Sequence, residues 1–130
     1  MRIKKDDIPV KLDAPGAKAR QSDNFGTAEG VLSAEYFSLG AGTDITPLLE
    51  GLEDNLCQAP HWGYVIEGEV VVTYGDGSDE TCQGGDLYYW PAGHTVRVVE
   101  DAELAMFSPQ AEHGHVIEHI AAKIAATATG

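Results

Sequence analysis

The sequence predicts an all-β barrel or sandwich with an extended N-terminal arm and one C-terminal helix. Two observations indicate the sheet: segments rich in β-branched and aromatic residues recur about every ten residues, and glycines stand at the turns between them. A third observation indicates the helix, because the apolar residues after Ser108 recur at helical spacing. For 130 residues we expect a single domain, 1–130, in which the barrel spans about 31–108 and the helix about 109–126.

The first thirty residues predict an extended arm. Residues 1–30 are polar and are interrupted by prolines and glycines, so they leave room for one short strand, at Ile8 to Leu12. An arm of this kind, or an uncovered sheet edge, favours association with a second copy of the chain. We therefore expect a homodimer.

The next segment predicts the first strand of the barrel. Residues 31–39 alternate roughly in polarity and stop at a glycine, and Glu35 and Phe37 fall on the same face of this strand. Residues 43–55 contain proline and glycine and show no steady period. They predict a loop with a strand fragment at 44–46.

The middle of the chain predicts short strands joined by glycine turns. Two apolar segments flank Glu67-Gly68, so we expect a hairpin there, and a second hairpin turn falls at Gly75 to Asp79. A further strand begins at Gly85 and ends in a turn at Pro91 to Gly93. The expected strands in this part are 63–66, 69–74, 80–83, 85–90, 95–99 and 103–107.

The end of the chain predicts a helix. Ser108 is expected to be its N-cap, and Pro109 its first helical residue. Its apolar residues form a stripe at helical spacing: Val116, Ile117, Ile120 and Ile124. We expect His113, His115 and His119 on the solvated face. The string from His115 to His119 matches the HxxEH pattern of some zinc peptidases, but a barrel of this size lacks the surrounding peptidase architecture.

The overall charge excludes several classes of partner. A formal net charge of -13 and a pI of about 4.5 oppose binding to nucleic acid and to anionic membranes, since both require clustered Lys and Arg. The sequence has no apolar run of about 18 residues and no signal-peptide pattern, so we expect a cytoplasmic protein. Its two cysteines, Cys57 and Cys82, are too few for a disulfide framework and are expected to be free thiols or ligands.

Glycines and a proline in the barrel region fall at spacings typical of a known family. Gly85, Pro91 and Gly93 match the cupin motif G(X)5PxG(X)2H(X)3N, and Gly68 matches the closing glycine of the cupin motif G(X)5HxH(X)3-4E(X)6G. Residues 31–108 therefore resemble a small single-domain cupin. The resemblance implies a double-stranded β-helix, or jelly-roll, barrel. Proteins with this resemblance include dioxygenases, isomerases, decarboxylases and lyases, so the resemblance does not indicate which reaction the chain would catalyse.

The metal-ligand positions of these motifs carry other residues in this chain. His61 stands where the first motif has its glutamate, and in the shorter spacing the two histidine positions before it fall on Asn55 and Cys57. The histidine of the second motif falls on Val96, with His94 two residues earlier. The usual set of three histidines and one glutamate is therefore absent from the sequence.

A rebuilt metal site would use Cys57, His61 and His94. Residues 94 and 96 have the same parity, so His94 points to the same face of an extended strand as the motif position. A straight strand would separate Cys57 from His61, but Pro60 favours a bend that brings them together. A thiolate with two imidazoles suits a divalent metal ion, Zn²⁺ best, with Fe, Mn or Ni as alternatives, and leaves one coordination position open. The alternatives are metal-free pocket groups and plain structural roles.

Further residues are expected to line a ligand pocket in the barrel. Alternation sends Tyr88 and Trp90 to one face of their strand and Leu87 and Tyr89 to the other, so one of the two pairs could face a cavity. Cys82 is expected to pack as a small apolar residue, because no CxxC pattern pairs it. The expected pocket residues are Glu35, Phe37, Asn55, Tyr64, Tyr89 and Val96.

Two functions of different classes remain open at this point. The first is a metal-dependent enzyme that acts on a small polar or carbonyl-bearing metabolite at the barrel mouth. The second is a non-catalytic small-molecule-binding or sensor protein without metal, which is favoured by the lack of an evident general base beside the three proposed ligands. A dimeric structural protein without a ligand cavity is a third hypothesis. The sequence does not decide whether the protein is an enzyme.

Overall fold

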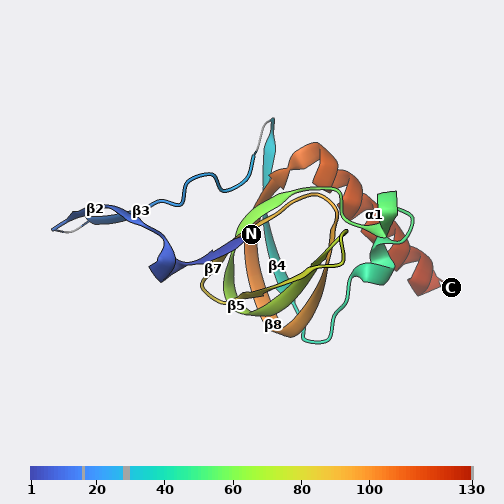
Figure 1. Cartoon of the computed structure of the whole chain (residues 1–130). Coiled ribbons are helices and arrows are strands. Elements are labelled where there is room, and N and C mark those ends of the chain that lie inside the picture. Colours follow the sequence, from blue (N-terminus) through green and yellow to red (C-terminus); the bar gives the residue numbers. More distant parts are fainter. Residues whose placement is uncertain (16, 28–29, 130) are drawn as a thin grey trace.

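The structure is a computed structural model that describes residues 1–15, 17–27 and 30–129. It confirms the predicted all-β fold with one C-terminal helix (Figure 1). A six-stranded antiparallel sheet has the order β1-β7-β5-β8-β4, and β6 pairs with β5 beside this path. Its strands are β1 Arg2–Lys4, β4 Leu32–Leu39, β5 His61–Tyr74, β6 Asp79–Gln83, β7 Asp86–Trp90 and β8 His94–Pro109. Within the described part of the chain, no helix is both long and apolar enough to cross a membrane.

Two long strands replace pairs of short ones, which corrects the sequence prediction. Residues 61–74 form the single strand β5, where a hairpin was expected at Glu67-Gly68, and residues 94–109 form the single strand β8. The register between the two strands shifts at Glu67 and Glu69. Gly68 has a φ of 91°, and an added Cβ would meet the backbone of Asp101. A glycine bulge therefore bends β5 within the barrel, where sequence alone suggests a turn. The second expected hairpin, between β5 and β6, is present.

The arm is attached to the barrel by its first strand. β1 pairs with β7 at the sheet edge, and the N-terminal amine of Met1 donates to Glu80 at 2.7 Å. The 3₁₀ helix η1 Lys5–Asp7 follows, and a hairpin of β2 Val10–Ala14 and β3 Ala17–Arg20 then projects from the barrel (Figure 1). The described residues of the arm thus contain three strands where one was expected. Assembly as a homodimer stays a prediction.

The barrel interior and the helix interface form two adjoining apolar clusters. The larger fills the barrel and includes Val70, Val72, Cys82 and Tyr88. The smaller joins the 3₁₀ helix η2 Thr46–Leu49, the segment Cys57–Ala59 and Val116 of the helix. The strand fragment expected at 44–46 is an isolated bridge between Asp44 and Arg97, just before η2. A further 3₁₀ helix, η3 Glu53–Asn55, follows η2.

The C-terminal helix α1 begins later than predicted. It spans Gln110–Thr129 and runs along one side of the barrel (Figure 1). Ser108 and Pro109 are the last residues of β8, so Ser108 is not the N-cap and Pro109 is not helical. Ser108 is instead fully buried, with its hydroxyl turned into the barrel mouth. In this position the Ser108 hydroxyl contacts both His61 and Glu35.

Candidate metal centre and ligand cavity

A cavity of about 290 Å³ lies between the barrel and α1. Its lining comes from strands β4, β7 and β8, from the start of β5 and the segment before it, from the segment 43–49 that contains η2, and from one face of the helix. The lining residues are Phe37, Leu39, Thr43, Ile45, Leu48, Leu49, Cys57, His61, Trp90, His94, Val96, Leu104, Met106, His113, Val116, Ile117 and Ile120. The volume is close to the lower end of the range typical of small-molecule sites.

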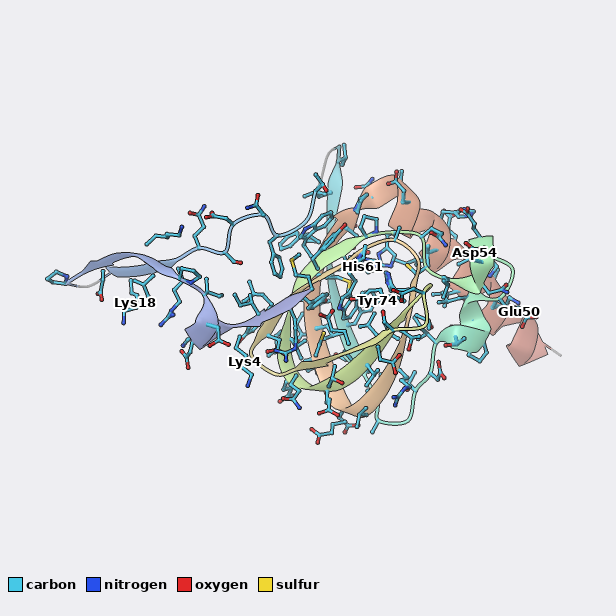
Figure 2. The ribbon with its side chains drawn as sticks, viewed as in Figure 1. Lys4, Lys18, Glu50, Asp54, His61 and Tyr74 are labelled. Carbon is cyan, nitrogen blue, oxygen red and sulfur yellow. The ribbon has the colours of Figure 1, made fainter. Side chains whose placement is uncertain are left out.

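Cys57, His61 and His94 converge on one wall of this cavity. Their candidate ligand atoms all lie within 4.8 Å of one another, and all three side chains are buried. The chain between Cys57 and His61 is not an extended strand, because strand pairing is interrupted around Pro60. The bend brings Cys57 Sγ to 3.6 Å from His61 Nε2. Cys57 forms an isolated antiparallel bridge with His94, with its N–H donating to the His94 carbonyl at 2.8 Å. Figure 2 shows the labelled His61 inside the barrel.

Hydrogen bonds fix which ring nitrogen of each histidine is free. Ser108 Oγ donates its only hydrogen to Glu35 Oε1 at 2.5 Å, so in the 2.6 Å contact with His61 it must accept from Nδ1. His94 Nδ1 donates to the carbonyl of Pro91 at 2.8 Å. In both rings Nε2 therefore carries no proton when the ring is neutral, and its lone pair is free. This is the arrangement in which a histidine is held ready to ligate a metal ion.

Glu35 connects this cluster to a third histidine, on the helix. Its second carboxylate oxygen accepts from His113 Nδ1 at 2.5 Å, which leaves His113 Nε2 without a proton when the ring is neutral. The rings of His61 and His113 are 4.4 Å apart, centroid to centroid. His113 was expected on the solvated face with His115 and His119, but only 6% of it is exposed. That expectation is wrong, because the helix turns residues 113, 116 and 120 toward the cavity.

Burial holds the cluster in its uncharged form. Desolvation lowers the pKa of His61 well below its ordinary value, and the neighbouring His94 and His113 add to the effect. Desolvation also lowers the pKa of His94 to about 4. The pKa of the Cys57 thiol is raised to about 11, again mainly by desolvation. Near neutral pH the two imidazoles and the thiol are therefore neutral when no ion is bound.

The remaining predicted pocket residues divide into two groups. Phe37 and Val96 line the cavity, and Glu35 reaches it through Ser108 and His113. Asn55 lies on η3 at the surface and accepts from the N–H of Gly51. Tyr64 is 39% exposed on the outer face of β5, and Tyr89 packs on Trp62 outside the barrel. These three residues therefore lie away from the cavity.

The sequence contains a signal for the inward position of His113. His113 precedes Val116 and Ile117 by three and four residues, so it belongs to the same helical stripe that was predicted to be apolar. Alternation also placed Tyr88 and Trp90 together, and both are indeed inside, with ring centroids 4.0 Å apart. Of this pair Trp90 lines the cavity. For Ser108 the sequence gives a helix-cap pattern, and only the long course of β8 reveals its buried position.

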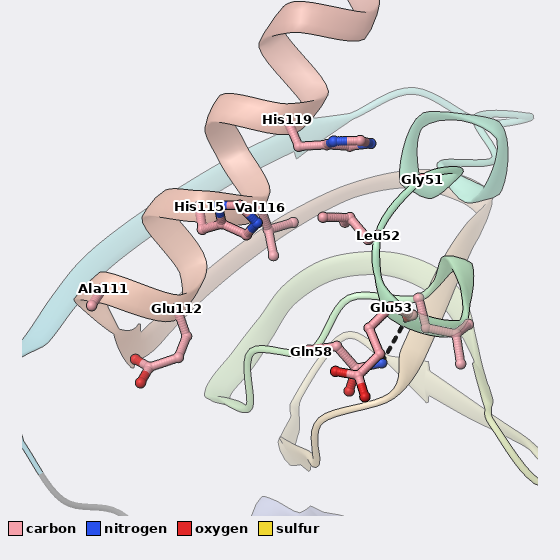
Figure 3. A pocket seen from close by; sticks show the side chains of 10 residues that line it. Gly51, Leu52, Glu53, Gln58, Ala111, Glu112, His115, Val116 and His119 are labelled. Carbon is pink, nitrogen blue, oxygen red and sulfur yellow. Dashed lines mark hydrogen bonds between the residues drawn. The ribbon is translucent and has the colours of Figure 1, made fainter.

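The HxxEH string lies at a different place from the buried cluster. His115 and His119 face an open surface groove between α1 and the Gly51–Glu53 segment (Figure 3). His119 Nε2 donates to the backbone carbonyl of Glu50 at 2.8 Å, so this nitrogen is occupied.

The course of the strands decides the architecture. Antiparallel strands curve around a filled interior, with Gly68 at the bulge of β5 and the Pro91–Gly93 turn leading into β8. The fold is that of a cupin. No family model matches the chain, and no curated protein matches its sequence.

Several solved structures are similar to this cupin fold at low sequence identity. A variant of salicylate 1,2-dioxygenase from Pseudoaminobacter salicylatoxidans is 20% identical, with a TM-score of 0.47, over 68% of this chain and 24% of that one. A putative ethanolamine utilization protein Q from Salmonella typhimurium is 13% identical, with a TM-score of 0.45, over 78% and 94%. A variant of oxalate decarboxylase from Bacillus subtilis is 21% identical, with a TM-score of 0.44, over 84% and 29%. The chain thus spans about a quarter of the dioxygenase and of the decarboxylase, and their activities are not transferred to it.

Proposed function

We propose that this cupin-fold protein is a divalent-metal-dependent enzyme that acts on a small carbonyl-bearing molecule. Cys57, His61 and His94 would hold the ion. One observation carries the proposal: Cys57, His61 and His94 each offer a candidate ligand atom within 4.8 Å of the other two, and the unprotonated Nε2 of His61 lies 3.6 Å from Cys57 Sγ. A histidine with only a packing role has no need of this arrangement.

The donor set favours particular ions. One thiolate and two imidazoles suit Zn²⁺ best, and other late first-row ions such as Fe, Ni and Mn less well. With three protein ligands, a fourth position stays open for water or substrate. When bound there, such an ion polarises a carbonyl oxygen or lowers the pKa of a bound water.

The residues around the ligands have distinct tasks in this proposal. Ser108 and Glu35 orient the ring of His61 through the hydrogen bonds at its Nδ1 side. His113 faces the same cavity, and its Nε2 can accept a proton from a carbon or a water held near the cluster. The Glu35 carboxylate, 2.5 Å from His113 Nδ1, then stabilises the imidazolium that forms. His113 therefore supplies the general base that the sequence did not reveal.

Metal analysis of tag-free protein tests the proposal. We expect wild-type protein to contain close to one equivalent of metal, and Cys57→Ser and His61→Ala to lose it. Cys82→Ser is the matched control, because Cys82 is also a buried free thiol but lies in the apolar core. Cobalt-loaded wild type and Cys82→Ser should show thiolate-to-cobalt charge-transfer absorption that Cys57→Ser lacks. Metal-free wild type that takes up no added Zn²⁺ or Co²⁺ would overturn the proposal.

A second candidate function is a metal-free protein that binds a small molecule in the same cavity. It is favoured by one observation: the cluster already has internal partners, since the Cys57 thiol lies 3.7 Å from the carbonyl of Ala59 and each ring Nδ1 is hydrogen-bonded. Under this alternative, wild type, Cys57→Ser and Cys82→Ser would all be metal-free, and added Zn²⁺ would change the stability of none of them. The metal analysis therefore separates the two functions.

A further inference from the structure

The cavity beside the cluster has a polar end and an apolar body. The polar end consists of Cys57, His61, His94 and His113, whose side chains form one contiguous group. The rest of the lining is apolar apart from Thr43 and the buried indole N–H of Trp90, and it is contributed by the barrel strands, the η2 segment and the helix α1. A ligand that fits this surface must be mostly apolar and carry its polar atoms at one end.

The polar end offers no fixed positive charge. None of the cavity's lining side chains, among the residues that the structure describes, is Lys or Arg. The Glu35 carboxylate next to it is already engaged by Ser108 and His113. An anionic ligand head would therefore lose its hydration without gaining a cation in the metal-free protein. An uncharged carbonyl oxygen only accepts, and the Nε2 atoms of the cluster carry no proton, so its partner is the Cys57 thiol in the metal-free protein or the ion in the metal-loaded protein.

The volume limits the size of the ligand. An engineered apolar cavity of roughly 150 Å³ is known to hold benzene, and this cavity, at about 290 Å³, is close to twice that size. A molecule of roughly ten non-hydrogen atoms therefore fills the space between the strands and the helix.

The geometry points to a specific ligand class: a compact apolar molecule with a single uncharged oxygen head, such as a medium-chain or aromatic ketone. The head lies at the imidazole cluster, and the apolar part lies among Phe37, Leu49, Met106 and Ile120. This inference deepens the proposed function and rests on it, since it assigns the ligand of the same site. It replaces the small polar metabolite expected from the sequence with a mainly apolar one.

A homologous series of methyl ketones tests this assignment on chelator-treated protein and on Zn²⁺-loaded protein. Titration calorimetry or ligand-observed NMR would follow acetone to 2-nonanone. We expect affinity to rise about fourfold for each added methylene and to stop rising at roughly ten non-hydrogen atoms. Hexanoate should bind the metal-free protein at least about tenfold more weakly than 2-heptanone. Affinities that do not depend on chain length would overturn the inference.

Two helix variants locate the ligand. Ile120→Trp fills the apolar end of the cavity and should abolish the chain-length dependence. Ile124→Trp is the matched control, because Ile124 lies one turn further along α1 and is 53% exposed. Circular dichroism verifies that both variants fold, and the ketone series on wild type stands without them. Equal ketone binding by both folded variants would place the ligand elsewhere and contradict the inference.

The two proposals can fail separately. Protein that takes up no metal but shows the chain-length dependence would refute the metal centre and keep the apolar ligand site. Protein that takes up one equivalent of Zn²⁺ without binding the ketones in either form would refute the ligand class and keep the metal centre.

Discussion

The barrel contains two buried cysteines whose surroundings differ. Cys82 lies on β6 in the main core, paired in register with Val70 and packed among residues such as Tyr88. Cys57 lies at the mouth, with its Sγ 3.6 Å from His61 Nε2. The pKa of each thiol is raised to about 11, mainly by desolvation. Burial therefore does not distinguish them. What distinguishes Cys57 is its place beside His61 and His94, with the unprotonated Nε2 of His61 facing its Sγ.

The largest expected difference between the two regions is the effect of metal on stability. If the ion binds only the folded chain, a thousandfold excess over its Kd stabilises the protein by about 4 kcal/mol. We expect added Zn²⁺ to raise the Tm of wild type and of Cys82→Ser, and a chelator to reverse the rise. Cys57→Ser should show no shift. Differential scanning fluorimetry at matched protein concentration measures this, and an equal shift for both cysteine variants would contradict the assignment of Cys57.

The second expected difference is in the pH dependence of the free energy of unfolding. The buried histidines beside Cys57 contribute to it, and the core around Cys82 does not. In the metal-free protein His94 has a pKa of about 4, below the value of about 6.5 in the unfolded chain. The unfolded chain therefore binds more protons between these values, and the contribution of His94 is complete above pH 6.5 and lost as the pH falls toward 4. The loss is about 3 kcal/mol. His61 acts in the same direction.

Urea unfolding between pH 4.5 and 7.5, with chelator present, measures this dependence. His94→Asn should flatten the curve over this window relative to wild type. Cys82→Ser should leave the curve unchanged, because the thiol that it removes has a pKa of about 11. A His94→Asn curve parallel to that of wild type would show that His94 does not titrate as inferred.

The fold was more predictable than the site because strand patterns are local. Alternation and glycine spacing revealed the strand segments and placed Tyr88 and Trp90 on one face, without deciding which face lies inside, and parity placed His94 and Val96 on one wall. The same local pattern predicted a hairpin turn at Gly68, where the structure has a bulge, because both features favour a residue of positive φ. Only the pairing of β5 with β8 across the barrel distinguishes them.

The sequence indicated only part of the candidate site. Cys57, His61 and His94 stand near the motif positions, so their proximity could be proposed from spacing and a proline bend. The second half, Ser108 and His113, depends on where β8 ends and α1 begins. Capping patterns are too permissive to locate that boundary, and a shift of one residue turned a buried hydroxyl into an expected helix cap.

A third, smaller difference concerns polar groups with and without partners. Ser108→Ala at the mouth leaves His61 Nδ1 and one oxygen of Glu35 without their hydrogen-bond partner. We expect a loss of about 1–3 kcal/mol in the free energy of unfolding, measured by urea denaturation at neutral pH. The variant should also bind Zn²⁺ more weakly, by roughly ten- to a hundredfold, because the His61 ring is no longer oriented. Wild-type stability and metal affinity in Ser108→Ala would contradict the role of Ser108.

The smallest expected effect is that of the matching change in the core, Tyr88→Phe. Within the described residues the Tyr88 hydroxyl is buried and has no hydrogen-bond partner, while its ring stacks on Trp90. Removal of this hydroxyl relieves an uncompensated desolvation and keeps the stacked ring, so we expect the free energy of unfolding to stay equal or to rise by up to about 1 kcal/mol. Metal and ketone binding should not change, since Tyr88 does not line the cavity. A destabilisation as large as that of Ser108→Ala would mean that the core hydroxyl has a partner, and the contrast between a hydrogen-bonded mouth and an apolar core would no longer hold.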